Sequence, residues 1–156
     1  MMGIPRAALG LGLAGVLPFA FGALIAGTGF EAWKGEIDRA NGYPFVVPKD
    51  GQDILVTYGI VIACFMAGVQ WGFAAPSEAR RTQGLVLSVI PALFVFFYVP
   101  GAAPSAALMN LVAAFLMVLA IDIVFRRWDL VPRWWLPLRF LLTSLVILCL
   151  LIGAFA

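Results

Sequence analysis

Two side chains within the apolar stretches of this sequence could support chemistry, the amide of Gln70 and the carboxyl of Asp122. Gln70 precedes Trp71 in a run of otherwise apolar and small residues. A primary amide that is surrounded by lipid must find a partner within the protein, because hydrocarbon offers no hydrogen bonds. We expect Gln70 either to bond to another helix and fix packing, or to line a small polar pocket together with Trp71.

Asp122 is the acid that lies within the body of an apolar stretch, near the end of that stretch. Ionisable groups inside membranes often mark functional sites, such as proton or substrate pathways. However, Asp122 precedes Arg126 by four residues, the spacing at which an acid and a base pair along a helix. We therefore favour an interfacial salt bridge between these two residues and keep a proton or substrate site as the alternative.

Arginine and tryptophan alternate with prolines in the segment 126–139. Tryptophan favours the headgroup level of a bilayer, and arginine at that level meets anionic lipid. The segment is therefore expected to anchor the chain at the membrane surface, with docking of a partner protein or of a cardiolipin-type lipid as the alternative. The candidate contacts are Arg126, Arg127, Trp128, Arg133, Trp134, Trp135 and Arg139.

The sequence contains no histidine, and its two cysteines both lie in apolar runs. Histidine-ligated haem, zinc or copper and histidine-based catalysis are thereby excluded. Gly10-x-Gly12-x-x-Gly15 resembles a dinucleotide fingerprint, but it begins an apolar helix instead of following a strand. Gly68-x-x-x-Gly72 has the spacing at which membrane helices approach closely. We predict no catalytic residue, no metal and no cofactor.

The elements that position these residues are five predicted transmembrane helices in an all-α bundle. Of the 156 residues, 63% are hydrophobic and only 12% are charged, more apolar surface than so small a soluble domain could bury. The chain is expected to form a single transmembrane domain over 1–156, with a polar loop at about 28–52 on the outer side. The predicted spans are about 5–27, 53–75, 83–99, 104–125 and 138–156.

The distribution of lysine and arginine predicts the orientation of the bundle, because basic residues favour the cytoplasmic side. Five spans place the termini on opposite sides. The N-terminal side then holds Arg6, Arg80, Arg81, Arg126, Arg127, Arg133 and Arg139, and the other side holds Lys34, Arg39 and Lys49. We predict that the N-terminus is inside and the C-terminus outside. The net charge of +2 is too small to suggest nucleic acid as a partner.

Several ordered motifs resemble those of the domain of unknown function 3429 family, which consists of small multi-span inner-membrane proteins and is similar to a mitochondrial transmembrane protein of animals. These motifs are Ile4 to Gly15, Tyr58-Gly59 leading to Gly68-Val69-Gln70-Trp71-Gly72, Ser88 to Leu93, and Pro132 to Trp135 with Leu138-Arg139. The resemblance implies a multi-span protein of the bacterial inner membrane and no settled activity. It also implies a histidine before the Trp-Gly pair, where this chain has Gln70, so that only hydrogen bonding would be common to both.

The leading functional hypothesis is a non-enzymatic accessory or assembly subunit of a larger inner-membrane complex. It follows from the scarcity of reactive groups and the abundance of helix-packing signals. The alternative is a small transporter or binder of a neutral or lipid-like molecule. In that reading Pro18 and Pro91, which lie within predicted spans, would hinge two helical hairpins around a pocket near Gln70 and Trp71.

Overall fold

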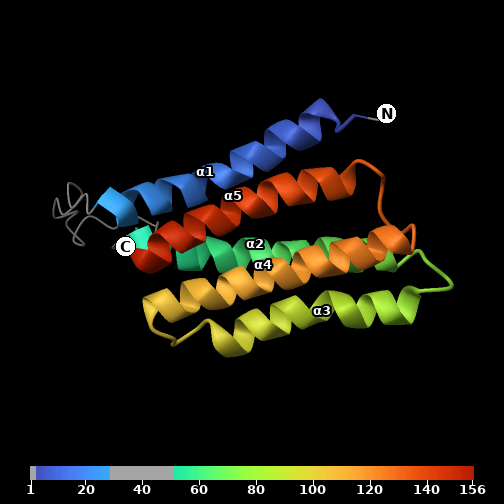
Figure 1. Cartoon of the computed structure of the whole chain (residues 1–156). Helices are drawn as coiled ribbons and strands as arrows, with labels where there is room; N and C mark the ends of the chain where they lie inside the picture. Colours follow the sequence, from blue (N-terminus) through green and yellow to red (C-terminus); the bar gives the residue numbers. More distant parts are fainter. Residues whose placement is uncertain (1–2, 29–50) are drawn as a thin grey trace, which may run out of the picture.

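The computed structural model describes residues 3–28 and 51–156, and the secondary structure in these ranges is helical. The five helices, shown in Figure 1, are α1 (Arg6–Thr28), α2 (Gly51–Ala74), α3 (Arg81–Tyr98), α4 (Pro104–Arg127) and α5 (Trp135–Phe155). Each is long and apolar enough to cross a membrane. The predicted all-α bundle of five transmembrane helices is therefore confirmed. Most of the predicted outer loop lies outside the described residues.

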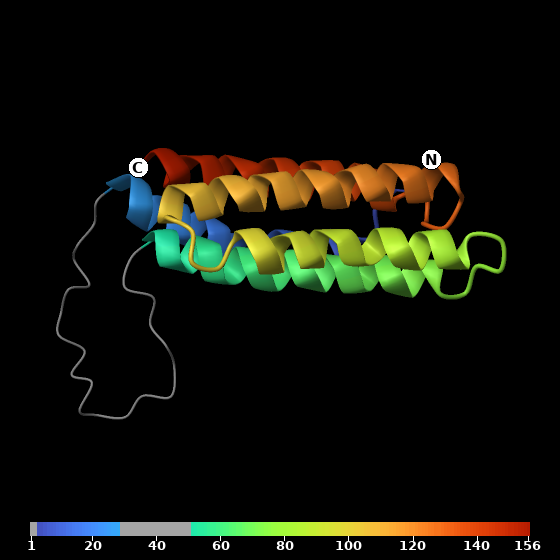
Figure 2. The ribbon, with the colours of Figure 1, turned by 90° about the horizontal axis from the view of Figure 1, so that it is seen from below.

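The helices pack antiparallel along the chain, and α2 lies at the centre of the bundle, in contact with the other four. Figure 2 shows α4 and α5 in one layer and α2 and α3 in the other. The N-terminus of α1 and the α2–α3 and α4–α5 connections lie at one end of the bundle. The C-terminus and the α3–α4 connection lie at the opposite end.

Glycines allow the helices to approach closely at several crossings. A Cβ atom on Gly59 of α2 would come within 2.7 Å of the Leu111 side chain of α4. A Cβ on Gly84 of α3 would come within 2.6 Å of the Cβ of Ala74 of α2. A larger residue at Gly84 would clash with the Cβ of Ala74, which cannot rotate away, whereas at Gly59 the flexible end of Leu111 would have to move.

Helix α1 is joined to the bundle mainly through its second half. Its buried residues, Phe19, Gly22 and Ala23, all follow Pro18, which lies inside the helix as predicted. Proline has no backbone N–H and crowds the preceding turn. In that turn the Gly15 carbonyl accepts a hydrogen bond of 3.1 Å from the Tyr58 hydroxyl of α2. The first half of α1 therefore holds no buried residue, although Gly15 bonds to α2.

The turn that follows α4 brings α5 back alongside it. The Leu130 N–H donates to the Phe125 carbonyl at 2.9 Å, and the Asp129 N–H donates to the Arg126 carbonyl at 3.3 Å. Together these bonds form a Schellman motif, in which the residue after the helix adopts the left-handed conformation. That residue is Asp129, with φ of 54°. The motif ends α4 and sets the position from which α5 starts at Trp135.

Candidate functional site

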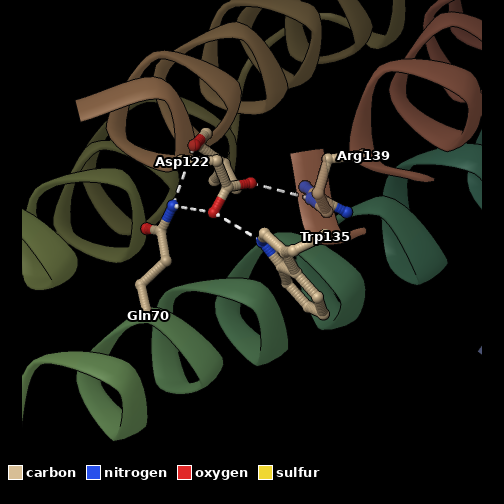
Figure 3. Close-up of polar contacts among 5 residues, drawn as sticks. Gln70, Asp122, Trp135 and Arg139 are labelled. Carbon is tan, nitrogen blue, oxygen red and sulfur yellow. Dashed lines mark hydrogen bonds and ion pairs between the residues drawn. The ribbon is translucent and has the colours of Figure 1, made fainter. Parts of the chain in front are cut away.

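A buried polar cluster lies where α2 and α4 end and α5 begins (Figure 3). Gln70 of α2 and Asp122 of α4 are each 0% exposed, and Arg139 of α5 is 4% exposed. Trp135, in the first turn of α5, completes the cluster and is half-buried. Three helices thus contribute polar side chains to one point in the interior.

Asp122 is the centre of this cluster, because both of its carboxylate oxygens accept hydrogen bonds. Its Oδ2 accepts from Arg139 Nε at 2.8 Å. Its Oδ1 accepts from Gln70 Nε2 at 3.1 Å and from Trp135 Nε1 at 3.1 Å. The positive guanidinium therefore balances the charge of the carboxylate, and two neutral groups also donate hydrogen bonds to it.

Gln70 is held in one orientation by two acceptors on α4. Its Nε2 donates to the Val118 carbonyl at 2.8 Å as well as to Asp122 Oδ1. Val118 lies one turn before Asp122, so a single amide group spans a full turn of α4. The bond to another helix that we predicted for Gln70 is present.

Trp71 does not belong to this cluster. Its side chain is 47% exposed, whereas Gln70 is fully buried. Consecutive residues on a helix point about 100° apart, so the inward position of Gln70 turns Trp71 outward. The structure brings Gln70 and Asp122 together, and the indole that joins them belongs to Trp135. Sequence spacing could not indicate the bond between Trp135 and Asp122, because the two residues belong to different helices.

The predicted salt bridge between Asp122 and Arg126 is wrong. Arg126 Nη1 instead pairs with Asp129 Oδ1 at 2.7 Å, outside the bundle core. Asp122 faces inward, and the return of α5 along α4 places Arg139 opposite it, where the two groups pair at 2.8 Å. The buried carboxylate is engaged by groups of α2 and α5, whereas Arg126 pairs with the exposed Asp129.

The placement of Arg139 at the membrane surface is also corrected. Arg139 is the last residue of the segment 126–139 and is predicted to contact lipid or a partner, but its side chain is buried against Asp122. The rest of that segment stays nearer the surface, with Arg127 and Arg133 exposed and Trp128 half-buried. The guanidinium of Arg80, from the α2–α3 connection, lies 5.0 Å from the centre of the Trp128 ring. Contact of these residues with anionic lipid stays a prediction.

Aromatic rings enclose the ion pair on one side. The Arg139 guanidinium carbon lies 6.0 Å from the Trp135 ring centre, and Phe73 meets Trp135 edge to face at 5.0 Å. In such an apolar setting an unpaired charge is costly, so each member of the pair depends on the other. Both oxygens of Asp122 are engaged, so the carboxylate connects α4 to α2 and α5. Within residues 3–28 and 51–156, no three His, Cys, Asp or Glu residues gather as a metal site requires.

Five helices that are each long and apolar enough to cross a membrane define a multi-pass membrane protein. The chain belongs to the family described as "Protein of unknown function (DUF3429)", whose model matches residues 4–155, nearly the whole chain. The membership expected from the sequence motifs is thereby confirmed. No curated protein and no solved structure matches the chain.

Proposed function

We propose that this protein is a non-enzymatic accessory or assembly subunit of a larger complex in the bacterial inner membrane. The observation on which the proposal rests is the outward face of α2. Gly68 and Gly72 lie there, both exposed, and a Cβ atom built on either would meet nothing within 4 Å. This G-x-x-x-G pair therefore packs against none of the described residues of its own chain.

Other glycines of the bundle show why this face is unusual. Gly59, Gly84 and Gly12 each lie against a side chain of a neighbouring helix. Small residues assist membrane helices only where another backbone approaches, because lipid gives no hydrophobic drive for helix association. A pair of glycines one turn apart on an exposed face supports docking of a helix from another subunit.

The interior supports a packing role more than a transport role. The Nε2 of Gln70 is engaged by α4, and the Trp71 ring lies on the outer surface. The pocket required by the alternative function, a small transporter or binder of a lipid-like molecule, would need both groups on one side. The proposal therefore assigns Gln70 to helix packing.

The basic residues at one end of the bundle support an N-terminus inside. The connections at that end and the helix termini beside them carry Arg80, Arg81, Arg126, Arg127 and Arg133, and α1 begins there with Arg6. Such an excess favours the cytoplasmic leaflet and its anionic lipids. Glu78, in the exposed α2–α3 connection, offers a test. A Glu78→Cys variant in a background without Cys64 should react with impermeant maleimide only after inverted vesicles expose the cytoplasmic face, and reaction in intact cells would reverse the orientation.

The accessory role is tested by a matched set of variants. Gly68→Leu/Gly72→Leu fills the outward face of α2, and Gly10→Leu fills an equally open position on α1. After purification in mild detergent, native mass spectrometry should show the parent chain in a larger assembly. The double variant should lose the partner subunit and keep its own fold, while Gly10→Leu should retain both. A strictly monomeric parent chain, or a double variant that keeps the partner, would refute the proposal.

The single thiol near this face provides an independent check. Cys64 lies one turn before Gly68 and is exposed, whereas Cys149 is buried. A thiol-directed cross-linker added to native membranes should therefore join Cys64 to the partner. Cross-linking should disappear in the Gly68→Leu/Gly72→Leu variant, since the partner helix would be displaced.

A further inference from the structure

Two buried donors on one face of α5 have no hydrogen-bond partner in the protein. They are Nη2 of Arg139 and Oγ1 of Thr143. The two residues are four apart, so they lie on the same side of the helix, one turn from each other. Their exposed fractions are 4% and 2%. We propose that Arg139 and Thr143 together bind one uncharged acceptor oxygen, supplied either by a water molecule or by the ester carbonyl of a lipid.

The hydroxyl of Thr143 is buried without a hydrogen-bond partner, unlike the hydroxyls of Thr28 and Ser144. Thr28 and Ser144 each donate to the carbonyl four residues earlier, at 2.6 Å and 2.7 Å, as hydroxyls in membrane helices commonly do. Thr143 makes no such bond to the carbonyl of Arg139 and has no other partner. A buried hydroxyl that forgoes this local bond is available to an outside acceptor.

Arg139 requires an acceptor for the same reason. A guanidinium can only donate, and its Nε is already committed to Asp122. Figure 3 shows the Arg139 guanidinium beside the Asp122 carboxylate, and Nη2 is the guanidinium nitrogen that is buried without a partner. Nη2 therefore needs an acceptor in addition to the Asp122 oxygen that Nε already engages.

Charge balance selects a neutral acceptor. Asp122 already compensates Arg139, so a second anion would add an uncompensated charge in an apolar interior, which is costly. A water or carbonyl oxygen has two lone pairs and can accept from both donors without adding charge.

Both sources of this oxygen are compatible with the position of the site. Nη2 of Arg139 and Oγ1 of Thr143 are both buried inside the protein, a setting in which a bound water molecule commonly satisfies polar atoms. Beside Thr143, however, Leu142 meets α1 at Gly12, in the half of α1 that has no buried residue. Arg139 also lies about 6 Å along α5 from Trp135, where the interfacial region of a bilayer meets its core. A lipid ester that entered between α1 and α5 would reach the same two donors.

The test is the sign of the stability change in Thr143→Val, which removes the hydroxyl and conserves the shape. If the hydroxyl holds an acceptor, Val should lower the equilibrium constant of folding about fivefold. Thr143→Ser keeps the donor and is the matched control, which should hold most of the stability. Unfolding is measured by titration with SDS, once in lipid-free detergent micelles and once in phospholipid bicelles.

A loss in both media identifies water as the source, and a loss only with phospholipid identifies the lipid carbonyl. If Thr143 has no acceptor, Val instead relieves a buried unsatisfied hydroxyl. Unchanged or increased stability of Thr143→Val in both media would therefore overturn the proposal.

Discussion

Arg139 and Asp122 pair across 2.8 Å although both side chains lie in the interior of a bundle of apolar helices. The pair joins α5 to α4, and Gln70 extends the connection to α2. Burying two charges gains little stability compared with apolar residues, but it leaves each charge dependent on the other. The pair therefore specifies which faces of α4 and α5 meet.

Replacing Asp122 by Asn should be the most damaging change in the cluster. The Arg139 guanidinium would stay buried without a counter-charge, and breaking such a pair commonly costs about 3–5 kcal/mol. The double variant Asp122→Leu/Arg139→Met, which removes both charges, should recover much of this loss. SDS titration of the three proteins checks the order. A loss below about 1 kcal/mol in Asp122→Asn alone would show that the pair is not maintained in the membrane.

Replacing Gln70 by Leu should have a smaller effect, because Asp122 Oδ1 keeps its bond from Trp135. Hydrogen bonds between membrane helices are worth at most about 1–2 kcal/mol. Gln70→Glu should be worse than Gln70→Leu, since it places a second carboxylate against Asp122. The free energies of unfolding of the two variants give the comparison, and equal losses would mean that Gln70 does not contact Asp122.

The two tryptophans Trp71 and Trp135 provide a matched pair. Trp135→Phe keeps a ring but removes the N–H bond that Asp122 accepts, so a loss of about 1–2 kcal/mol is expected for this bond between α5 and α4. Trp71→Phe changes an exposed ring and should leave the free energy of unfolding nearly unchanged. Thermal unfolding of both variants distinguishes the roles, and a larger effect at Trp71 would contradict the assignment.

The turn after α4 should become more stable with Asp129→Gly. Asp129 has a left-handed backbone, which costs a residue with a side chain roughly 1 kcal/mol and costs glycine little. The ion pair to Arg126 that would be lost involves an Asp129 side chain that is 87% exposed, so its contribution is small. Asp129→Val should destabilise the same turn. The midpoints of SDS unfolding should fall in the order Gly, Asp, Val, and any other order would argue against the Schellman motif.

The sequence predicted the five helices well because long apolar stretches are a strong and local signal. It also predicted that Gln70 needs a protein partner, because an amide in lipid has no other option. It could not identify that partner, since Asp122 lies on a different helix and the packing of helices decides which faces meet. The same limit produced the wrong pairing of Asp122 with Arg126, which rested on spacing within one helix.

Arg139 shows how a small shift in a boundary changes a residue's role. The predicted fifth span began at 138, which placed Arg139 at the membrane surface beside the tryptophans. The helix begins at Trp135, so Arg139 lies a full turn inside it and faces Asp122. Pro137 lies in the first turn of this helix, where a proline is tolerated because its missing N–H needs no partner within the helix.

The order of the helices along the chain has a consequence for how the protein is made. Asp122 leaves the ribosome with α4, whereas Arg139 follows only with α5, the last helix. A charged aspartate at the centre of a lone helix opposes membrane insertion by about 2.5–3.5 kcal/mol, and by less near its end. Nascent α4 therefore gains its counter-charge only when synthesis reaches α5, so the two helices are best inserted together as a hairpin, with the Arg139–Asp122 pair formed during entry into the bilayer.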